Sequence, residues 1–453
     1  MSKTINLKKG FDINLAGKAE KKLTSDIMPD SFAFKPTDFH GILRPKLLVN
    51  EGDTVKAGTP ILFDKKKPDV QFCSAVSGEV AEVVRGEKRK ILEVRILPDK
   101  TMEYESFKSY SVSELKSIDR AVLQEQMLKS GVWPNIIQRP FGVIANPLDS
   151  PKAIFISAFD THPLAPDLDY VHKGEEKYFQ AGIDVLKKFT SGTIHLNVSA
   201  EKEVSAVFSN IKDVQLNKFS GPHPVGNVGV QIHHLDPISK GDIAWTVNPA
   251  GVIQIGKLFL EGKYDASIVF AVAGGEVKKP QYYKSYRGAC IKKFVDQNVK
   301  SENLRYVSGN VLTGTRIAPD GYLGFYDQLL SIIKEGNEYV PFGWILPTDR
   351  LSYHRAIGLF SFLNKKKEHV LDTNTRGEPR AFVQTGIFEQ VTPMDIFPLY
   401  LLKAIMAGDF DDMEALGIYE VIEEDLALCE FVDVSKHNIQ EMVRDGIELI
   451  QNS

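Results

Sequence analysis

Three histidines lie in one short stretch rich in proline and glycine, SGPHPVGNVGVQIHHLDPISKGD, which runs from Ser220 to Asp242. Histidine is a common metal ligand, so the stretch raises the question of a metal site. We expect Val228 to Leu235 to form a strand, on which His233 and His234 would point to opposite faces and could not easily share one ion. A zinc site would need further Cys, Asp or His at ligand spacing, and the nearby candidates are only His223 and Asp236. The stretch therefore gives no good support for a metal site.

The glycines of this stretch also depart from the known phosphate-binding loops. Those loops read GxxxxGK[ST], or GxGxxG between a strand and a helix, whereas Gly226 and Gly229 lead into the expected strand. We therefore interpret residues 220–242 as a connection whose prolines and glycines fix the path of the chain. It is expected to lead from an α/β part of the protein into a β-rich module.

A second group of polar residues follows an expected buried strand, Ala153 to Ser157. The loop AFDTHPLAPD then supplies Asp160 and His162, before an expected helix at Glu175 to Phe189 and a strand at Gly192 to Val198. This order and spacing predict a βαβ unit with a parallel sheet. Ligands of such sheets bind beyond the carboxyl ends of the strands, so Asp160, Thr161 and His162 occupy the position where a ligand would bind.

The segment from Ile42 to Leu97 is β-rich and resembles the biotinyl and lipoyl type of barrel-sandwich domain. Its sequence LLVNEGDTVKAGTPILFDKKKPDVQFCSAVSGEVAEV has the GD-x-V-x-x-G turn, and alignment from Gly78 places Lys67 where that class carries its modified lysine. The flanking residues differ from those of both biotinyl and lipoyl domains. A carrier protein modified on Lys67 is thus one hypothesis, and a structural β module with a basic tip is the favoured one.

Length and composition bound the remaining possibilities. A chain of 453 residues should form about two to four domains. A net charge of −4 gives no general reason to bind nucleic acid or an anionic membrane. The three cysteines, Cys73, Cys290 and Cys429, are far apart, which fits a reducing, cytoplasmic setting and supplies neither disulfides nor a cluster. We find no signal peptide and no apolar run near the roughly 20 residues of a membrane span, so other subunits would have to hold the chain at a membrane.

Helices and a further β module are expected between and after these segments. Ser111 to Gly131 predicts one helix, opened by a capping box of Ser111 and Glu114. The segment DASIVFAVAGGEVKKPQYYKSYRGACIKKFVDQ resembles a small β-grasp-like module of the SLBB type. From Pro393 the pattern turns helical, with an apolar face that Pro398 interrupts.

The C-terminal region combines an apolar helix with an acidic run. An apolar stripe is expected on the helix Ser435 to Ile450. Between Ala404 and Val434 there are ten acidic residues and no Lys or Arg. Such a run predicts a solvated face, with a docking surface for a basic partner as the alternative.

Several long, irregular motifs together are similar to the A subunits of sodium-translocating NADH:quinone oxidoreductases. They are RGEKR, SGPHPVGNVGVQIHH, VSGNVLTGT, DGYLGFY, FGWILP, RAFVQTGIFEQVTPMDIFPLYLLKAIMAGD and EALGIYEVIEEDLALCEFV, and the resemblance runs from Lys8 to about Ile450. It implies a peripheral subunit on the cytoplasmic side of the bacterial inner membrane, without a transmembrane segment of its own. Its implied partners are the B to F subunits, chiefly the membrane-embedded B subunit. The complex is implied to use NADH, flavins, iron–sulfur centres and quinone in other subunits, while it exports sodium.

The implied fold class is a multidomain α/β protein. We expect a barrel-sandwich β module with an N-terminal extension (1–105), a Rossmann-like α/β domain (106–220), an SLBB-type β-grasp-like module (221–335) and a C-terminal domain (336–453). The last is expected to be helical from about residue 393 and to resemble a ferredoxin-type domain without clusters.

The family is more distantly similar to the C subunit of the Rnf complex and to the flavin subunit of respiratory complex I, both of which carry redox cofactors. Their FMN loop GxGGAGFP corresponds to SGVWPNIIQRPFG here, where Trp133, Pro134 and Pro140 replace bare backbone and amide donors. Their second FMN segment, NADESEP, retains only Asp160 and a downstream proline. FMN binding is therefore not expected.

The Rnf C subunits also carry the motif CxxCxxCxxxCP twice, because each [4Fe–4S] cluster needs four thiolates. The first position reads TGIFEQVTP and the second VIEEDLALCEFV, which keeps Cys429 alone. We interpret Cys429 as a packed thiol.

We therefore expect a subunit that holds no redox cofactor or metal, has no catalytic residue of its own, and serves assembly. Binding of a quinone head group in the vacated flavin cleft is a further hypothesis. Its candidate residues are Trp133, Phe141, Asp160 and His162, for each of which ordinary packing is the alternative. The rival functions are a carrier protein modified on Lys67, an oxidoreductase subunit with its own flavin, and a scaffold without quinone contact.

Overall fold

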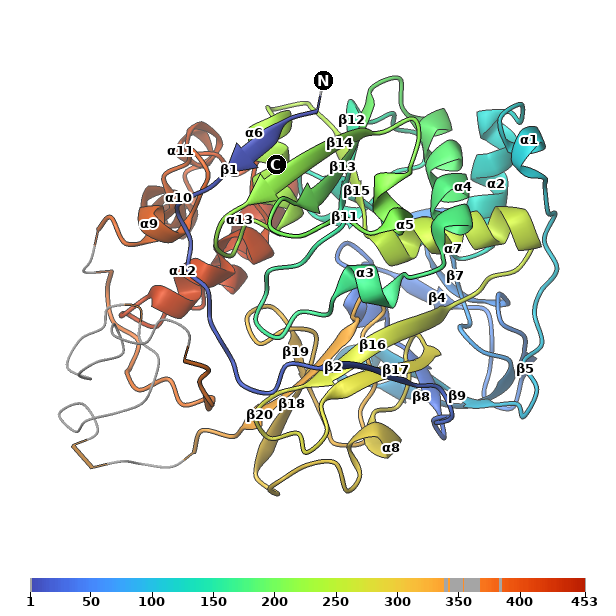
Figure 1. Cartoon of the computed structure of the whole chain (residues 1–453), viewed down its shortest axis with the longest axis horizontal. Coiled ribbons are helices and arrows are strands. Elements are labelled where there is room, and N and C mark those ends of the chain that lie inside the picture. Colours follow the sequence, from blue (N-terminus) through green and yellow to red (C-terminus); the bar gives the residue numbers. More distant parts are fainter. Residues whose placement is uncertain (1, 338–340, 343–352, 354–366, 383–384, 453) are drawn as a thin grey trace.

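The computed structural model describes residues 2–337, 341–342, 353, 367–382 and 385–452. Of the motif FGWILP, only Phe342 is among the described residues. In the motif that begins RAFVQTGIFEQ, residues 383–384 lie outside them. Figure 1 shows the parts of the chain packed into one body, with the N-terminal β module and the C-terminal helices at opposite ends.

The N-terminal part forms two small antiparallel sheets, with strand orders β3-β9-β8-β5 and β4-β6-β7. Its strands are β3 (Phe32–Phe34), β4 (Pro45–Leu47), β5 (Thr54–Val55), β6 (Pro60–Asp64), β7 (Lys67–Cys73), β8 (Gly78–Arg85) and β9 (Ile91–Pro98). The two sheets share an apolar core that includes Ile61, Val80 and Val94. In β8, Gly78 and Val80 are buried while Glu79 is exposed, which is the period of a half-buried strand. The β-rich expectation for residues 42–97 is confirmed.

The central part is a seven-stranded sheet of order β1-β14-β13-β12-β15-β10-β11. Its strands are β1 (Thr4–Asn6), β10 (Ile136–Arg139), β11 (Val143–Ile144), β12 (Ala153–Ser157), β13 (Thr193–Ser199), β14 (Gln215–Ser220) and β15 (Ala244–Val247). The neighbouring strands β1, β14, β13, β12 and β15 pair in parallel. Strand β10 pairs antiparallel with both β15 and β11. The expected βαβ unit of β12, α4 (Glu176–Leu186) and β13 is confirmed.

Helices cover both faces of this sheet. Adjacent residues of β12 point to opposite sides: Ile154 packs in the core with Phe179 of α4, whereas Phe155 packs with Ile232 on the other face. The helices of this part are α1 (Val112–Leu115), α2 (Arg120–Lys129), α3 (Leu168–Val171), α4, α5 (Ala206–Ser209), α6 (Val228–Leu235) and α7 (Pro249–Glu261). The capping box of Ser111 and Glu114 is present. However, the helix that it opens, α1, ends after one turn, so two helices form in place of the single one expected.

The expected strand at Val228 to Leu235 is wrong, because these residues form helix α6. Their β-branched side chains favour a strand locally, but α6 buries four consecutive residues between the sheet and the C-terminal helices. The role expected for residues 220–242, a connection into the next module, is also wrong. After them β15 returns to the sheet between β12 and β10, so a division at residue 220 would cut through this sheet.

A six-stranded sheet of order β19-β18-β20-β16-β17-β2 follows. It contains β2 (Glu20–Thr24), β16 (Ser267–Ala273), β17 (Gln281–Tyr286), β18 (Leu304–Ser308), β19 (Thr315–Ile317) and β20 (Leu329–Lys334), with the short helix α8 (Lys292–Val295). The segment DASIVFAVAGGEVKKPQYYKSYRGACIKKFVDQ supplies β16, β17 and α8. The N-terminal extension contributes β1, β2 and β3 to three different sheets, and Figure 1 shows this dark blue segment passing from one sheet to the next.

The C-terminal helices are α9 (Phe388–Val391), α10 (Pro398–Ala407), α11 (Phe410–Ala415), α12 (Ala427–Val432) and α13 (Ile439–Asn452). Pro398 begins α10 rather than interrupting a helix, because the first turn needs no amide donor there. The apolar stripe expected on the last helix is confirmed by the burial of Ile439, Val443, Ile447 and Ile450. Figure 1 shows these red helices beside the α/β sheet, next to α6.

Candidate functional site

The loop that follows β12 holds Asp160 and His162 in direct contact. One carboxylate oxygen of Asp160 accepts the His162 backbone N–H at 2.8 Å and contacts its ring Nδ1 at 2.6 Å. The ring of His223 lies 4.6 Å from that of His162, and its Nδ1 lies 3.1 Å from the hydroxyl of Thr161. The carboxyl end of β12 therefore carries the polar cluster that the βαβ pattern predicts, and the following stretch adds His223 to it.

The ionisable groups of this cluster have shifted pKa values, which fix which of them are charged. Burial would raise the pKa of Asp160, but the adjacent His162 lowers it to about 2. Burial likewise lowers the pKa of His162, while Asp160 raises it more, and the net shift is upward. Burial and the nearby His162 lower the pKa of His223 to about 3. At neutral pH the group is thus a carboxylate paired with His162, beside a neutral His223.

Arg139, the last residue of β10, connects the sheet to the C-terminal helices. Its Nη1 donates to Asp425 at 2.9 Å and its Nη2 donates to Glu424 at 2.7 Å. Asn227, just before α6, donates from its side chain to the backbone carbonyl of Glu424 at 3.0 Å. Gly229 packs directly against Asp425: a Cβ added to Gly229 would lie 2.3 Å from a carboxylate oxygen of Asp425. Arg139 and Asp425 are each 2% exposed, so this ion pair is fully desolvated.

We call the contact between the α/β part and the segment around Glu424 and Asp425 the joint. Several buried polar atoms there have no hydrogen-bond partner within the described residues. They are Arg139 Nε, His162 Nε2, His223 Nε2, Asn227 Oδ1 and Asp425 Oδ1. Glu424 and Asp425 raise the pKa of His162 electrostatically, so the two sides of the joint interact. An unpaired buried polar atom costs about 1–3 kcal/mol. We define these five residues together with Asp160 and Glu424 as the joint cluster, which offers both donors and acceptors to a polar molecule.

The other two residues predicted for the site lie in different surroundings. Trp133 is fully buried in the core between Phe189 and Trp245, and its indole N–H donates to a backbone carbonyl. Phe141 is half-buried, its ring packs edge-on against Tyr419, and its carbonyl accepts from Arg444. Asp160, His162 and Phe141 thus approach the same C-terminal segment, whereas Trp133 does not reach it.

The residues that correspond to the cofactor sites of the distant relatives do not fit those cofactors. Trp133 fills the position of the flavin loop with a packed indole, and Pro140, after a cis peptide bond, has no amide to donate. Cys429 is buried, its sulfur lies 3.2 Å from the Thr392 hydroxyl, and burial raises its thiol pKa to about 12. No group of three or more His, Cys, Asp or Glu within the described ranges could hold a metal ion. The interpretation of Cys429 as a packed thiol is confirmed.

Lys67 is held in place at the tip of the β6–β7 hairpin. Its ammonium donates to the carbonyl of Ile144 in β11 at 3.0 Å, and burial lowers its pKa. A swinging carrier lysine would have to be free of such a contact.

Sequence reasoning missed the role of His233 and His234. His233 pairs with Glu420 at 2.7 Å and accepts the Asp395 amide at 3.0 Å, while His234 contacts the carbonyl of Pro393 at 2.7 Å. Both histidines therefore fasten α6 to the C-terminal helices. Their adjacency to a glycine-rich run was the visible signal, but their partners lie far away in the chain.

The acidic run between Ala404 and Val434 is also more than a solvated face. Glu423 pairs with Arg444, Glu424 and Asp425 pair with Arg139, and Glu414 pairs with Lys240. These acids thus form ion pairs with basic side chains of the described chain, and all but Glu423 reach back to the α/β part. The expectation of a merely solvated face is corrected accordingly.

Three family models match the chain. They are the NqrA N-terminal barrel-sandwich hybrid domain at residues 5–99, the NqrA second alpha/beta domain at residues 118–264 and the NQRA C-terminal domain at residues 269–318. The coarse expectation of a barrel-sandwich module followed by an α/β domain is confirmed. The second match extends through β15 and α7, in agreement with the sheet.

Curated proteins match over the whole length. The chain is 36% identical to the A subunit of the Na(+)-translocating NADH-quinone reductase of Yersinia pestis bv. Antiqua (strain Angola), over 99% of each chain. It is 37% identical to the protein of the same name from Serratia proteamaculans (strain 568), and 34% identical to that from Vibrio atlanticus (strain LGP32), again over 99% of each chain. A chain of the NAD+-reducing [NiFe]-hydrogenase in the H2-reduced state aligns over 52% of both chains with a TM-score of 0.37 and 11% identity, a likeness too slight to bear on the fold.

Proposed function

The chain belongs to the family of the A subunits of Na(+)-translocating NADH-quinone reductases, and from this premise we propose that it is a peripheral subunit of such a reductase on the cytoplasmic side of a bacterial inner membrane. The complex passes electrons from NADH to quinone and couples their transfer to sodium export. No helix among the described residues is long and apolar enough to cross a bilayer. The membrane-embedded B subunit is proposed as its main partner, in an assembly with the C to F subunits.

The single observation that carries this proposal is the extent of the likeness. Identity of 34–37% spans 99% of this chain and of its relatives, so it covers all the domains rather than one of them. A shared domain alone would support a shared fold, but not a shared place in an assembly.

We propose further that the subunit serves assembly rather than electron transfer. The packed indole of Trp133 and the solitary buried thiol of Cys429 support this role, because neither a flavin phosphate nor a four-thiolate cluster can be held by them. The contact of Cys429 with Thr392 supports a ferredoxin-type ancestry of the C-terminal domain, since the two segments aligned with the cluster motifs lie against each other. The parallel sheet covered on both faces supports a Rossmann-like ancestry of the second domain.

Quinone contact belongs to the same proposal, at the joint cluster. The free Nε2 of His162 can donate a hydrogen bond to a quinone carbonyl, and the ring of Phe141 can pack against the quinone ring. Asp160 would hold His162 in the donating form. Trp133 would support this site from the core without touching the ligand.

Deleting the gene tests the proposed place in the complex. Membranes of the deletion strain should lose sodium-stimulated NADH:quinone reductase activity, and the remaining subunits should be depleted. Normal activity and a normal amount of the other subunits would contradict the assembly role. Photolabelling of the intact complex with an azidoquinone tests the quinone contact separately: label in the peptide that contains His162, reduced by His162→Leu, supports it, while label confined to other subunits refutes it.

A further inference from the structure

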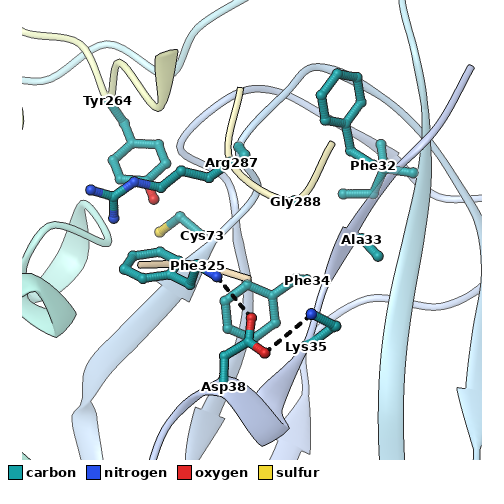
Figure 2. Close-up of a pocket in the computed structure, with 12 residues that line it drawn as sticks. Phe32, Ala33, Phe34, Lys35, Asp38, Cys73, Tyr264, Arg287, Gly288 and Phe325 are labelled. Carbon is teal, nitrogen blue, oxygen red and sulfur yellow. Dashed lines mark hydrogen bonds and ion pairs between the residues drawn. The ribbon is translucent and has the colours of Figure 1, made fainter. Parts of the chain in front are cut away.

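A narrow slot lies between the N-terminal β module and the six-stranded sheet. Its walls include the rings of Phe32, Phe34, Tyr264 and Phe325, and its volume is about 20 Å³. A cavity needs about 10–15 Å³ to hold one water-sized particle, so this slot accepts a single small species and no organic ring. Figure 2 shows the guanidinium of Arg287 beside the rings of Tyr264 and Phe325, with Phe32 on the opposite side of the slot.

Arg287 enters the slot from the end of β17. It is 4% exposed, and the carbon of its guanidinium lies 4.2 Å from the centroid of the Phe325 ring. Its Nη1 is buried and has no hydrogen-bond partner in the described part of the chain, where Arg287 forms no ion pair either. A buried cation is normally paired with a carboxylate, because desolvation otherwise disfavours it strongly. Burial accordingly lowers the pKa of Arg287.

The nearby acids are already engaged with other cations. Asp38, the acid that lines the slot, pairs with Lys35 at 3.3 Å and accepts the Phe325 amide at 2.8 Å. Asp265 pairs with Lys257 at 3.0 Å. Burial raises the pKa of Asp38 to about 6, so its carboxylate is ionised at pH 7.5. Lys35 and Asp38 thus pair with each other, while no carboxylate accepts a hydrogen bond from Arg287 Nη1 within the described residues.

We propose that the slot is a binding site for one compact monovalent anion, of the size of chloride, held by the unpaired donor of Arg287 between the aromatic rings. The volume excludes phosphate esters and carboxylates with an organic body. The apolar walls favour an anion that sheds its water easily, so bromide should bind at least as well as chloride and better than fluoride. The site is independent of the joint cluster, and the anion supplies the acceptor that Arg287 Nη1 lacks within the described residues.

Bromide serves as the probe, because it scatters anomalously at its absorption edge. Crystals of the full chain are grown without chloride and soaked in sodium bromide. The proposal predicts an anomalous peak within hydrogen-bond reach of Arg287 Nη1. Peaks confined to surface lysines, or a slot that holds only water, would overturn it.

Thermal unfolding gives an independent readout in solution. The melting temperature of the wild type should rise saturably in sodium bromide relative to sodium gluconate at equal ionic strength. Arg287→Met should lose this saturable rise, whereas Arg316→Met should keep it, because Arg316 is an exposed arginine of the adjoining cleft. If Arg287→Met does not fold, Arg287→Lys is used, for which a weaker apparent affinity is expected. An equal bromide response in wild type and the Arg287 variant would contradict the site.

Discussion

Arg139 is a buried cation whose counter-charge Asp425 lies 286 residues away in the chain. Arg139→Gln would leave Asp425 without that charge in a desolvated place. Removing one partner of a buried pair costs about 3–5 kcal/mol, and we expect a loss of that size in the free energy of unfolding measured with urea. Lys240→Gln, which breaks the exposed pair with Glu414, is the matched control and should cause no measurable loss. Equal effects of the two variants would contradict the importance of the joint.

Two buried histidines should make the protein sensitive to acid. Burial lowers the pKa of His172 to about 3 and that of His223 to about 3. Below about pH 6.5 these histidines are protonated in the unfolded chain but remain neutral in the folded chain. The free energy of unfolding therefore decreases as the pH falls from about 6.5 towards 3. Each group contributes about 1.4 kcal/mol per pH unit in that window. His172→Phe should reduce the slope of the unfolding free energy between pH 6 and pH 5 by about that amount, and an unchanged slope would refute the assignment.

The chemistry at the residue scale was only half visible in the sequence. Asp160 and His162 could be placed at a ligand-binding edge because strand, helix and strand followed each other at the spacing of a βαβ unit. Their surroundings could not be predicted, since Glu424 and Asp425 are more than 250 residues away and one sequence records no contacts between distant positions. For the same reason an acidic run that reaches back to Arg139 resembled a solvated surface.

Helices α4 and α7 cross at two glycines. A Cβ on Gly182 would lie 2.1 Å from the carbonyl oxygen of Val252, and a Cβ on Gly256 would lie 1.9 Å from that of Tyr178. Alanine is a better helix former than glycine by about 1 kcal/mol, so propensity alone predicts that Gly256→Ala stabilises. Because the clash is with backbone, we expect instead a net loss of about 1–3 kcal/mol in thermal or urea unfolding. Lys177→Ala on the exposed side of α4 is the control, and stabilisation by Gly256→Ala would show that the helices separate easily.

Element types were predictable where local pattern and tertiary burial agree. The strands β12 and β13 and the last helix have such patterns and were found. Residues 228–235 were misread because Val228, Val230 and Ile232 favour a strand, while the position between the sheet and the C-terminal helices requires a helix. The end of the α/β part was misplaced because β15 returns to the middle of the sheet after a proline-rich stretch typical of a connection.

At the scale of the molecule, the parts are tied together by segments that cross between them. The N-terminal extension supplies one strand to each of three sheets, and the histidines of α6 and Arg139 bind the C-terminal helices. The order of the modules could be predicted from motifs, but these ties could not, since each joins residues far apart in sequence. A body fastened in this way suits a subunit that presents fixed surfaces to several partners.

Affinity purification from native membranes tests the central claim most directly. The chain, tagged at its C-terminus and expressed from its own locus, is isolated in mild detergent, and the preparation is assayed for copurifying proteins and for activity. We predict that five further subunits, including a membrane-embedded one, copurify with NADH:quinone reductase activity that sodium stimulates. A chain that purifies alone, from membranes whose sodium-stimulated activity stays in the unbound fraction, would contradict the account.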